Sequence, residues 1–337
     1  MSYRGRARGF QTSTPASGSA NPYAGLAAGA WQELTGTTIR SVVPGSGWTG
    51  NPTAITDAWS GGCVDTLRHR LLVWGGGHTD YDGNEVYAIN FSATPGVARI
   101  FGPTGGSPVS MHTYGGMAYM SHVDKMFEVG GAVAPSGSKD NTVWELNLTS
   151  NTFASHGTAT ITGVTLGTWC AYDPVTERVY VNDRNSIFTF QESSGTWTNR
   201  GGSADSGSLN VTACIDSTRR RFVCIDSGAL TYMHLDTFST GSISTSNTPG
   251  TVGENNPGLV YDPVGDRFVL WAGGTAVYAV AAAGGAWADI RTSDGPSSLQ
   301  ASTGTYGRWG YDPAYKVCVL CNSIDENLFV FKLASGS

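Results

Sequence analysis

The chain has 337 residues, enough for two ordinary domains or one large all-β domain, and 40% of them are hydrophobic, which allows a sizeable core. Its 46 glycines and its low charged fraction of 14% favour short strands joined by tight turns. The net charge of −6 argues against nucleic acid as a partner, and no apolar stretch is long enough to span a membrane.

Residues 1–30 differ in composition from the rest of the chain. They contain Arg4, Arg6 and Arg8, no acidic residue, and many Gly, Ala, Ser and Pro residues. Such a segment cannot bury enough apolar surface to fold alone. We therefore interpret residues 1–30 as an extended basic arm that a partner subunit holds. The segment also lacks the apolar core of a secretory signal, so we expect cytoplasmic synthesis without export.

From about residue 59 onward, a short sequence motif recurs six times. Each copy has an apolar run that ends near an Asp, a tight turn, and a second apolar run. The third residue of each motif is used here as its marker. The markers are Asp65, Met120, Asp173, Asp216, Asp262 and Asp312. The markers follow one another at intervals of 43 to 55 residues. A repeat of this size cannot bury its own apolar face and must pack against its neighbours.

The interval is typical of four-stranded propeller blades, so we predict an all-β, six-bladed β-propeller over residues 31–337. In the first unit the predicted strands are 59–64, 71–74 and 85–90. In the fifth unit they are 258–261, 268–271 and 276–280, with a fourth strand that begins at Trp287. The sixth unit ends after its third strand. We predict that a strand from Trp31 to about Val43 completes this last blade and closes the ring.

Three units also resemble the kelch repeat. The first has Val73-Trp74-Gly75-Gly76 followed by the strand 84–90, and the second has Val129-Gly130-Gly131 followed by 141–147. The third match is Ala272-Gly273-Gly274 with Val277-Tyr278. The resemblance implies a kelch-like propeller of the galactose-oxidase type. Since the copper-site residues of galactose oxidase have no match here, we expect no cofactor.

Loops on one face of the predicted ring gather the unusual side chains. These are the connections between successive units and those between the second and third strands of a unit. They bring together aromatic, His, Arg and amide groups, which can stack on and hydrogen-bond a glycan. The candidate ligand-binding residues are Trp59, His78, Tyr81, His112, Tyr114, Trp169, Asn210, Asn256, Tyr306 and Arg308. Aromatic residues at these positions can also simply plug the channel, and Arg308 can bind the backbone of a neighbouring blade.

Three other groups of residues invite a chemical interpretation. Asp80 and Asp82 are weak candidates for a metal site, but the spacing and the distal Glu of a calcium loop are missing, so we predict no metal. The aspartates of the repeated turns cap turn amides, so we interpret them as structural. The six cysteines lie in apolar runs and favour a reduced protein.

Two functional hypotheses follow. The first is a non-catalytic binding or structural propeller, a tail or receptor-binding component of a phage virion, which recognises glycan or protein through its loop face. The alternative is a polysaccharide lyase, in which His78, His112, Tyr114 and Arg308 would supply the acid, the base and the cation. A histidine within hydrogen-bond reach of Tyr or Arg in an open pocket would favour the lyase.

Overall fold

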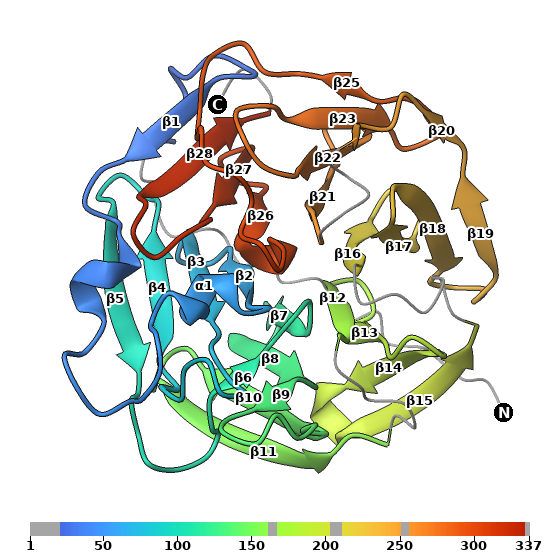
Figure 1. The fold of residues 1–337 in the computed structure, drawn as a ribbon. Helices are drawn as coiled ribbons and strands as arrows, with labels where there is room; N and C mark the ends of the chain where they lie inside the picture. The colour runs from blue at the N-terminus through green and yellow to red at the C-terminus, as the bar shows by residue number, and fades with distance from the viewer. Residues whose placement is uncertain (1–20, 161–166, 203–210, 251–255, 334–337) are drawn as a thin grey trace, which may run out of the picture.

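The computed structural model describes residues 21–160, 167–202, 211–250 and 256–333. It shows six four-stranded antiparallel sheets arranged around a central axis as the blades of a β-propeller (Figure 1). The all-β fold and the six blades are therefore confirmed. None of the helices in these residues has the length and apolar character needed to cross a lipid bilayer.

The blades are numbered in chain order, and their strands are given from the axis outward. Blade 1 contains β2 (Gly61–Asp65), β3 (Arg70–Trp74), β4 (Val86–Asn90) and β5 (Gly96–Phe101). Blade 2 contains β7 (Met117–Met120), β8 (Lys125–Val129), β10 (Thr142–Asn147) and β11 (Thr152–Thr158). Blade 3 contains β12 (Trp169–Asp173), β13 (Arg178–Asn182), β14 (Ile187–Gln191) and β15 (Thr196–Gly201). Blade 4 contains β16 (Val211–Asp216), β17 (Arg221–Asp226), β18 (Ala229–His234) and β19 (Thr240–Ile243). Blade 5 contains β21 (Gly258–Asp262), β22 (Arg267–Trp271), β23 (Tyr278–Ala281) and β25 (Ala288–Asp289). Blade 6 contains β26 (Trp309–Asp312), β27 (Val317–Leu320), β28 (Leu328–Lys332) and β1 (Trp31–Leu34).

Small elements lie between the blades. Two short strand pairs are β6 (Met111–His112) with β9 (Ala132–Val133) and β20 (Thr245–Ser246) with β24 (Gly285–Ala286). The helical turns include α1 (Ala54–Asp57), η1 (Ile39–Val42), η2 (Glu192–Ser194) and η4 (Tyr306–Arg308). The strands predicted for the first and fifth units lie within two residues of those observed. That agreement follows from the strength of the repeated apolar pattern.

The N-terminal strand closes the ring. β1 pairs antiparallel with β28, with Trp31 opposite Phe331 and Leu34 opposite Leu328. The Trp31 and Phe331 rings lie 4.9 Å apart, so the pairing also buries aromatic surface. The strand is shorter than the predicted 31–43. It ends at Leu34 because Gly36 adopts a left-handed φ of +78°, and the chain then turns into η1.

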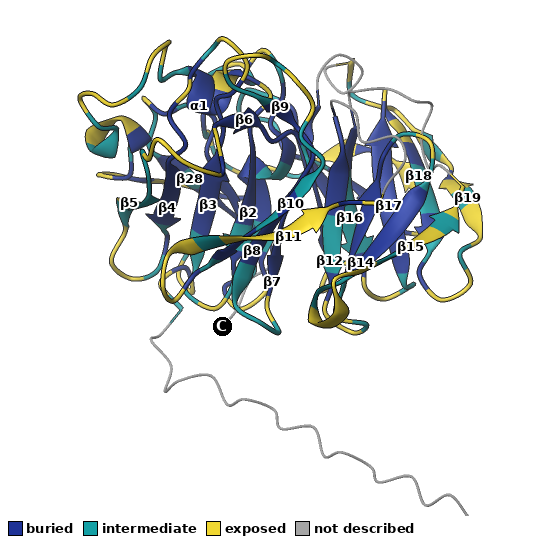
Figure 2. Cartoon of the chain, turned by 90° about the horizontal axis from the view of Figure 1, so that it is seen from below, coloured by how far each residue is buried: buried dark blue, intermediate teal, exposed yellow. Residues whose placement is uncertain are grey.

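The burial of the strands changes from the middle of each blade to its outer edge. All six residues of β17 are buried, whereas β11 at the outer edge is exposed along nearly its whole length (Figure 2). The inner strands bury their apolar side chains against the adjacent blades. The core is therefore a ring of interfaces between blades, as expected of repeats that cannot fold singly.

The turn between the first and second strands of a blade, called here the a–b turn, is built by its Asp. The Asp173 carboxylate accepts hydrogen bonds from the amides of Val175 and Thr176, and Asp262 accepts two from its own turn in the same way. The predicted structural role of these aspartates is confirmed. Four residues after each marker, one residue has a left-handed φ: His69, Asp124, Glu177, Arg220, Asp266 and Lys316.

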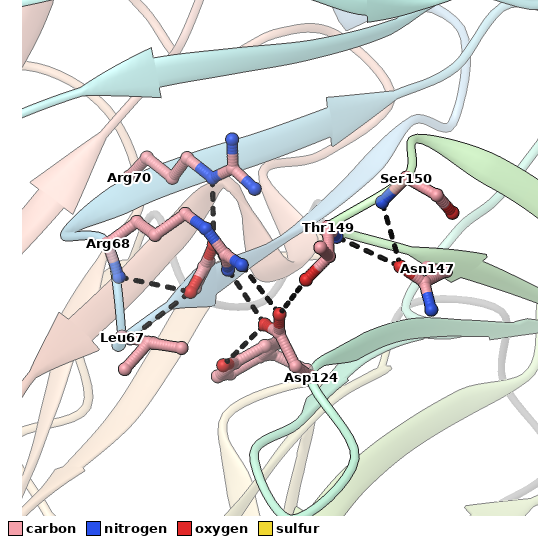
Figure 3. A network of polar contacts seen from close by, with 9 residues as sticks. Leu67, Arg68, Arg70, Asp124, Asn147, Thr149 and Ser150 are labelled. Carbon is pink, nitrogen blue, oxygen red and sulfur yellow. Dashed lines mark hydrogen bonds and ion pairs between the residues drawn. The ribbon is translucent and has the colours of Figure 1, made fainter.

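Charged side chains of these turns join neighbouring blades. Blade 2 has Met120 in place of the marker Asp, and Asp124 of its turn instead receives both terminal nitrogens of Arg68 from blade 1, at 2.7 and 2.5 Å (Figure 3). Arg220 of blade 4 reaches Asp173 of blade 3 at 2.7 and 2.8 Å. The turns therefore link the blades as well as ending their strands.

Residues 21–30, within the segment assigned to the arm, lie against the propeller. Tyr23 is buried, and its hydroxyl donates a 2.5 Å hydrogen bond to the Phe91 carbonyl. The Asn21 amide donates to the Tyr315 carbonyl at 3.4 Å. Residues 1–20, with the three arginines, lie outside the described residues. All six cysteines are free thiols.

Candidate functional site

The connection between β3 and β4 forms one wall of a pocket on the loop face. Gly77 donates to the Tyr81 carbonyl at 2.7 Å and closes this connection into a tight loop. The segment before α1 is bound to it, since the Asn51 amide donates to the Asp80 carbonyl at 2.8 Å. Gly50 makes this approach possible, because a Cβ there would lie 2.1 Å from the Asp80 carbonyl oxygen and the φ is +94°.

The pocket lies between this loop and α1. It has a volume of about 220 Å³ and is lined by Asn51, Thr53, Ala54, Asp57, Ala58, Trp59 and Asp80. The Thr303 hydroxyl fixes Trp59 in place: it accepts from the Trp59 amide and donates to the Asp57 carbonyl, both at 2.7 Å. The Trp59 side chain remains 36% exposed. The pocket therefore offers an indole ring, two carboxylates, an amide and a hydroxyl.

An aromatic cluster backs Trp59. Its ring centroid lies 5.0 Å from that of His112, and the His112 ring lies 5.9 Å from His78 and 6.0 Å from Tyr114. Trp59, His78 and Tyr114 have φ values of +48°, +48° and +46°. Non-glycine residues avoid this region, and such strain gathers at functional sites. Unlike the left-handed residues of the a–b turns, these three lie next to one pocket.

Charge in the pocket is negative. The His112 Nε2 lies 2.9 Å from an Asp80 oxygen, and burial lowers the pKa of His112 although Asp80 opposes the shift. Burial also raises the pKa of Asp57, against the attraction of the Arg308 guanidinium. Among the lining residues there are two carboxylates and no cation. A neutral ligand with hydroxyl donors suits this lining better than an anionic one.

Five predicted site residues are placed here or next to it. Trp59 lines the pocket, and His78, His112 and Tyr114 form the cluster behind it. His78 is exposed, whereas His112 and Tyr114 are each 3% exposed. Tyr81 is buried beneath the loop, where its hydroxyl donates to the Glu85 carboxylate at 3.0 Å. It therefore supports the loop rather than facing the pocket.

The other predicted residues have structural contacts. Arg308 is fully buried and donates five hydrogen bonds to main-chain carbonyls, those of Ser60, Thr56, Gly304, Cys321 and Asn322. Tyr306 is buried, and its hydroxyl accepts from Asn256 at 2.7 Å. Trp169 is buried with its indole nitrogen 3.3 Å from the Cys224 sulfur. Asn210 lies outside the described residues.

Asp80 and Asp82 do not converge on one point. Asp80 contacts His112, whereas Asp82 accepts from the hydroxyl of Thr49 at 2.6 Å and from its amide. Within the described ranges, the group whose ligand atoms lie close enough to share an ion is Glu145, His156 and Glu192, between blades 2 and 3. The Lys125 ammonium contacts both glutamates of that group. A metal there would compete with this lysine.

Sequence reasoning missed Asn51, Thr53 and Asp57. They belong to the connection between β1 and β2, which is part of no repeat. One signal was present, because Asn51-Pro52-Thr53 is a turn sequence, and the Asn51 side chain does accept from the Thr53 amide at 3.1 Å. Nothing in the sequence showed that this turn would meet the loop at Asp80.

Comparisons with known proteins define the fold. No family model and no curated protein sequence matches this chain. Two solved structures are similar to this chain. The structure of YjhT has 10% sequence identity and a TM-score of 0.56, and the match covers 83% of this chain and 98% of YjhT. An auxiliary nutrient binding protein from Bacteroides thetaiotaomicron has 10% identity and a TM-score of 0.55, and the match covers 89% of this chain and 75% of that protein. These likenesses show a shared β-propeller fold and leave the function open.

Proposed function

We propose that the protein is a non-catalytic binding propeller that recognises a glycan through the Trp59 pocket. The observation that carries the proposal is the partly exposed indole of Trp59 beside Asn51, Asp57 and Asp80. An aromatic face stacks on the C–H surface of a sugar ring, while amide and carboxylate groups bond its hydroxyls. The volume of about 220 Å³ suits one sugar unit, since it is below the usual range for drug-sized ligands.

The lining argues for a neutral sugar and against lyase chemistry. A lyase acting on uronates needs a cation for the carboxylate, and Arg308, the expected one, is occupied by five carbonyls. In the described part of the chain, no hydrogen bond joins His78 or His112 to a tyrosine or an arginine. Asp80 is the polar partner of His112 instead.

A glycan array tests the proposal with the wild type and Trp59→Ala and Trp59→Phe variants. We expect binding to neutral glycans, a loss of about fivefold or more in Trp59→Ala, and partial retention in Trp59→Phe, because loss of ring stacking costs about 1 kcal/mol or more. Leu299→Ala, at an 85% exposed side chain, serves as the control that should bind normally.

Three results would contradict the proposal. If no glycan is retained, protein remains as the ligand of the loop face. If Trp59→Ala binds like the wild type, the ligand lies elsewhere. If incubation with uronate polysaccharides produces the ultraviolet absorbance of unsaturated products, the lyase replaces the binding module.

The kelch assignment is part of the same proposal. Its support is geometric: in the three matching units, Gly76, Gly130, Gly131, Gly273 and Gly274 all have left-handed φ values. In the first unit only the second glycine of the pair has such a φ, so the backbone requires a glycine at the second position in all three units. The setting in a phage virion, with a partner subunit holding residues 1–30, stays a prediction from composition and is tested by deletion, as argued in the Discussion.

A further inference from the structure

The central channel contains a second, larger cavity. It has a volume of about 420 Å³ and is lined by the innermost strands of all six blades: β2, β7, β12, β16, β21 and β26. At one end its lining consists of residues from the a–b turns: Thr66, Ser121, Pro174, Ser217, Pro263 and Pro313. Trp59 precedes β2 and these turns follow the innermost strands, so this end lies on the face opposite the Trp59 pocket. It is a separate site.

The lining of this cavity carries no charged residue. Its side chains are mainly aliphatic, aromatic and thiol groups. Several tyrosines line it, and the hydroxyls of three of them are bonded to turn residues: Tyr119 to Asp124 at 3.2 Å, Tyr261 to Asp266 at 2.8 Å, and Tyr172 to His122 at 2.9 Å. Their polar ends are therefore already satisfied. What remains for a ligand is apolar ring surface.

Two hydroxyls of the lining are unpaired. Within the described residues, the Thr212 and Tyr311 hydroxyls are buried and have no hydrogen-bond partner. Buried polar groups are normally hydrogen-bonded, so each exception calls for an explanation. Both oxygens are inaccessible to water, so they give a ligand in the channel no polar contact.

Three of the a–b turns at this end of the cavity carry an exposed apolar side chain. Leu67, Val175 and Val264 occupy the same position in three of the a–b turns and are 64%, 70% and 59% exposed. They are half of the six exposed large hydrophobic side chains among the described residues. Single exposed apolar residues need no explanation, but each of these directly follows a residue that lines the cavity, in turns that also carry ion pairs.

We propose that the channel binds an uncharged, mainly apolar small molecule, which is admitted at the a–b turn face. The volume lies within the usual range of ligand pockets, and the absence of charge excludes ionic ligands on desolvation grounds. The ligand packs against the aliphatic and tyrosine surface of the channel. This site is independent of the glycan proposal.

A fluorescence titration with N-phenyl-1-naphthylamine, an uncharged aromatic probe, tests the proposal. We expect saturable binding to the wild type. Ala171 and Ala213 line the channel and are half-buried, so Ala171→Phe and Ala213→Phe should fill it and weaken binding at least tenfold. Ala93→Phe makes the same change at an exposed alanine and should bind like the wild type. Equal binding by all variants, or no saturable binding by the wild type, would overturn the proposal.

A second measurement needs no variant. The thiol of Cys214 lines the channel and is half-buried. Its modification by methyl methanethiosulfonate, followed by mass spectrometry, should be slowed several-fold by saturating probe. An unchanged rate would place the probe outside the channel and overturn the proposal even if the filled variants failed to fold.

Discussion

Glu128 is a carboxyl group buried in strand β8 with no hydrogen-bond partner among the described residues. Burial raises its pKa well above the ordinary value, and the nearby charge of Asp140 adds to this shift. Because the pKa in the folded protein exceeds that in the unfolded chain, the contribution of Glu128 to stability is complete below the unfolded pKa. It is lost as the pH rises toward the folded pKa.

Glu128→Gln should therefore stabilise the protein in a pH-dependent way. We expect little change in the free energy of unfolding at pH 4 and a gain of about 1 kcal/mol or more at pH 8, because the amide needs no proton to remain neutral. Urea unfolding at pH 4, 6 and 8 measures the difference. A gain that does not grow with pH would be inconsistent with a buried neutral carboxyl.

Glu145 provides the matched control. It lies on the adjacent strand β10 and is 1% exposed, but its carboxylate contacts Lys125 and His156, both at 2.8 Å. Glu145→Gln weakens these contacts, so the same chemical change should destabilise the protein at pH 8. If the free energy of unfolding changes in opposite directions in the two variants, the charged partner of the glutamate, rather than burial alone, decides the effect.

At the scale of the element, the a–b turn is the unit that the repeat preserves. Its left-handed residue stands four positions after the marker in every blade, yet none of the six is a glycine. A left-handed conformation costs about 1–2 kcal/mol for a residue with a Cβ, against about 0.5–1 kcal/mol of added chain entropy for glycine. The turns therefore contain conformational strain that a single substitution can remove.

Glu177→Gly should raise the free energy of unfolding by about 0.5–1 kcal/mol. Val175→Gly, in the same turn but outside the left-handed residues, should lower it, because glycine there adds chain entropy without relieving strain. Thermal unfolding of both variants provides the comparison. If both variants lose stability, the strain at position 177 does not exist.

The elements that could be predicted are those that repeat. Asp173 and Asp262 predict their turns because an Asp side chain caps turn amides, and the apolar runs on either side predict the strands. The pocket could not be predicted in the same way, since Asn51 and Asp57 meet Asp80 only because the connection before β2, which belongs to no repeat, folds onto the loop between β3 and β4. Arg308 shows a related limit: its position near a channel mouth is visible in sequence, but its five carbonyl partners come from segments far apart in the chain.

At the scale of the whole molecule, the ring depends on its N-terminus. Residues 21–30 contact blades 1 and 6, since Tyr23 bonds the Phe91 carbonyl and its ring contacts Tyr315, and β1 closes blade 6 by pairing Trp31 with Phe331. The proposed attachment of an arm to a partner subunit therefore concerns residues 1–20, which lie outside the described residues. A deletion series can separate attachment from closure.

Removal of residues 2–20 should leave the melting temperature unchanged, because Tyr23 and β1 remain. If the arm attaches the propeller to a larger particle, this deletion should also abolish incorporation. Unchanged incorporation would contradict the hypothesis that the arm attaches the propeller to a larger particle. It would not change the description of the fold. The wild type expressed in the same host is the reference for both measurements.

Removal of residues 2–34 should act on the ring itself. It exposes the edge of β28, whose backbone groups then have no partner and can pair with another chain. We expect a lower melting temperature and concentration-dependent association, measured by scanning calorimetry and light scattering, in contrast to a monodisperse protein after deletion of 2–20. If the longer deletion stays monodisperse with an unchanged melting temperature, β1 is dispensable and closure comes from the packing between blades. The two deletions differ only in residues 21–34, so any difference in behaviour belongs to that segment.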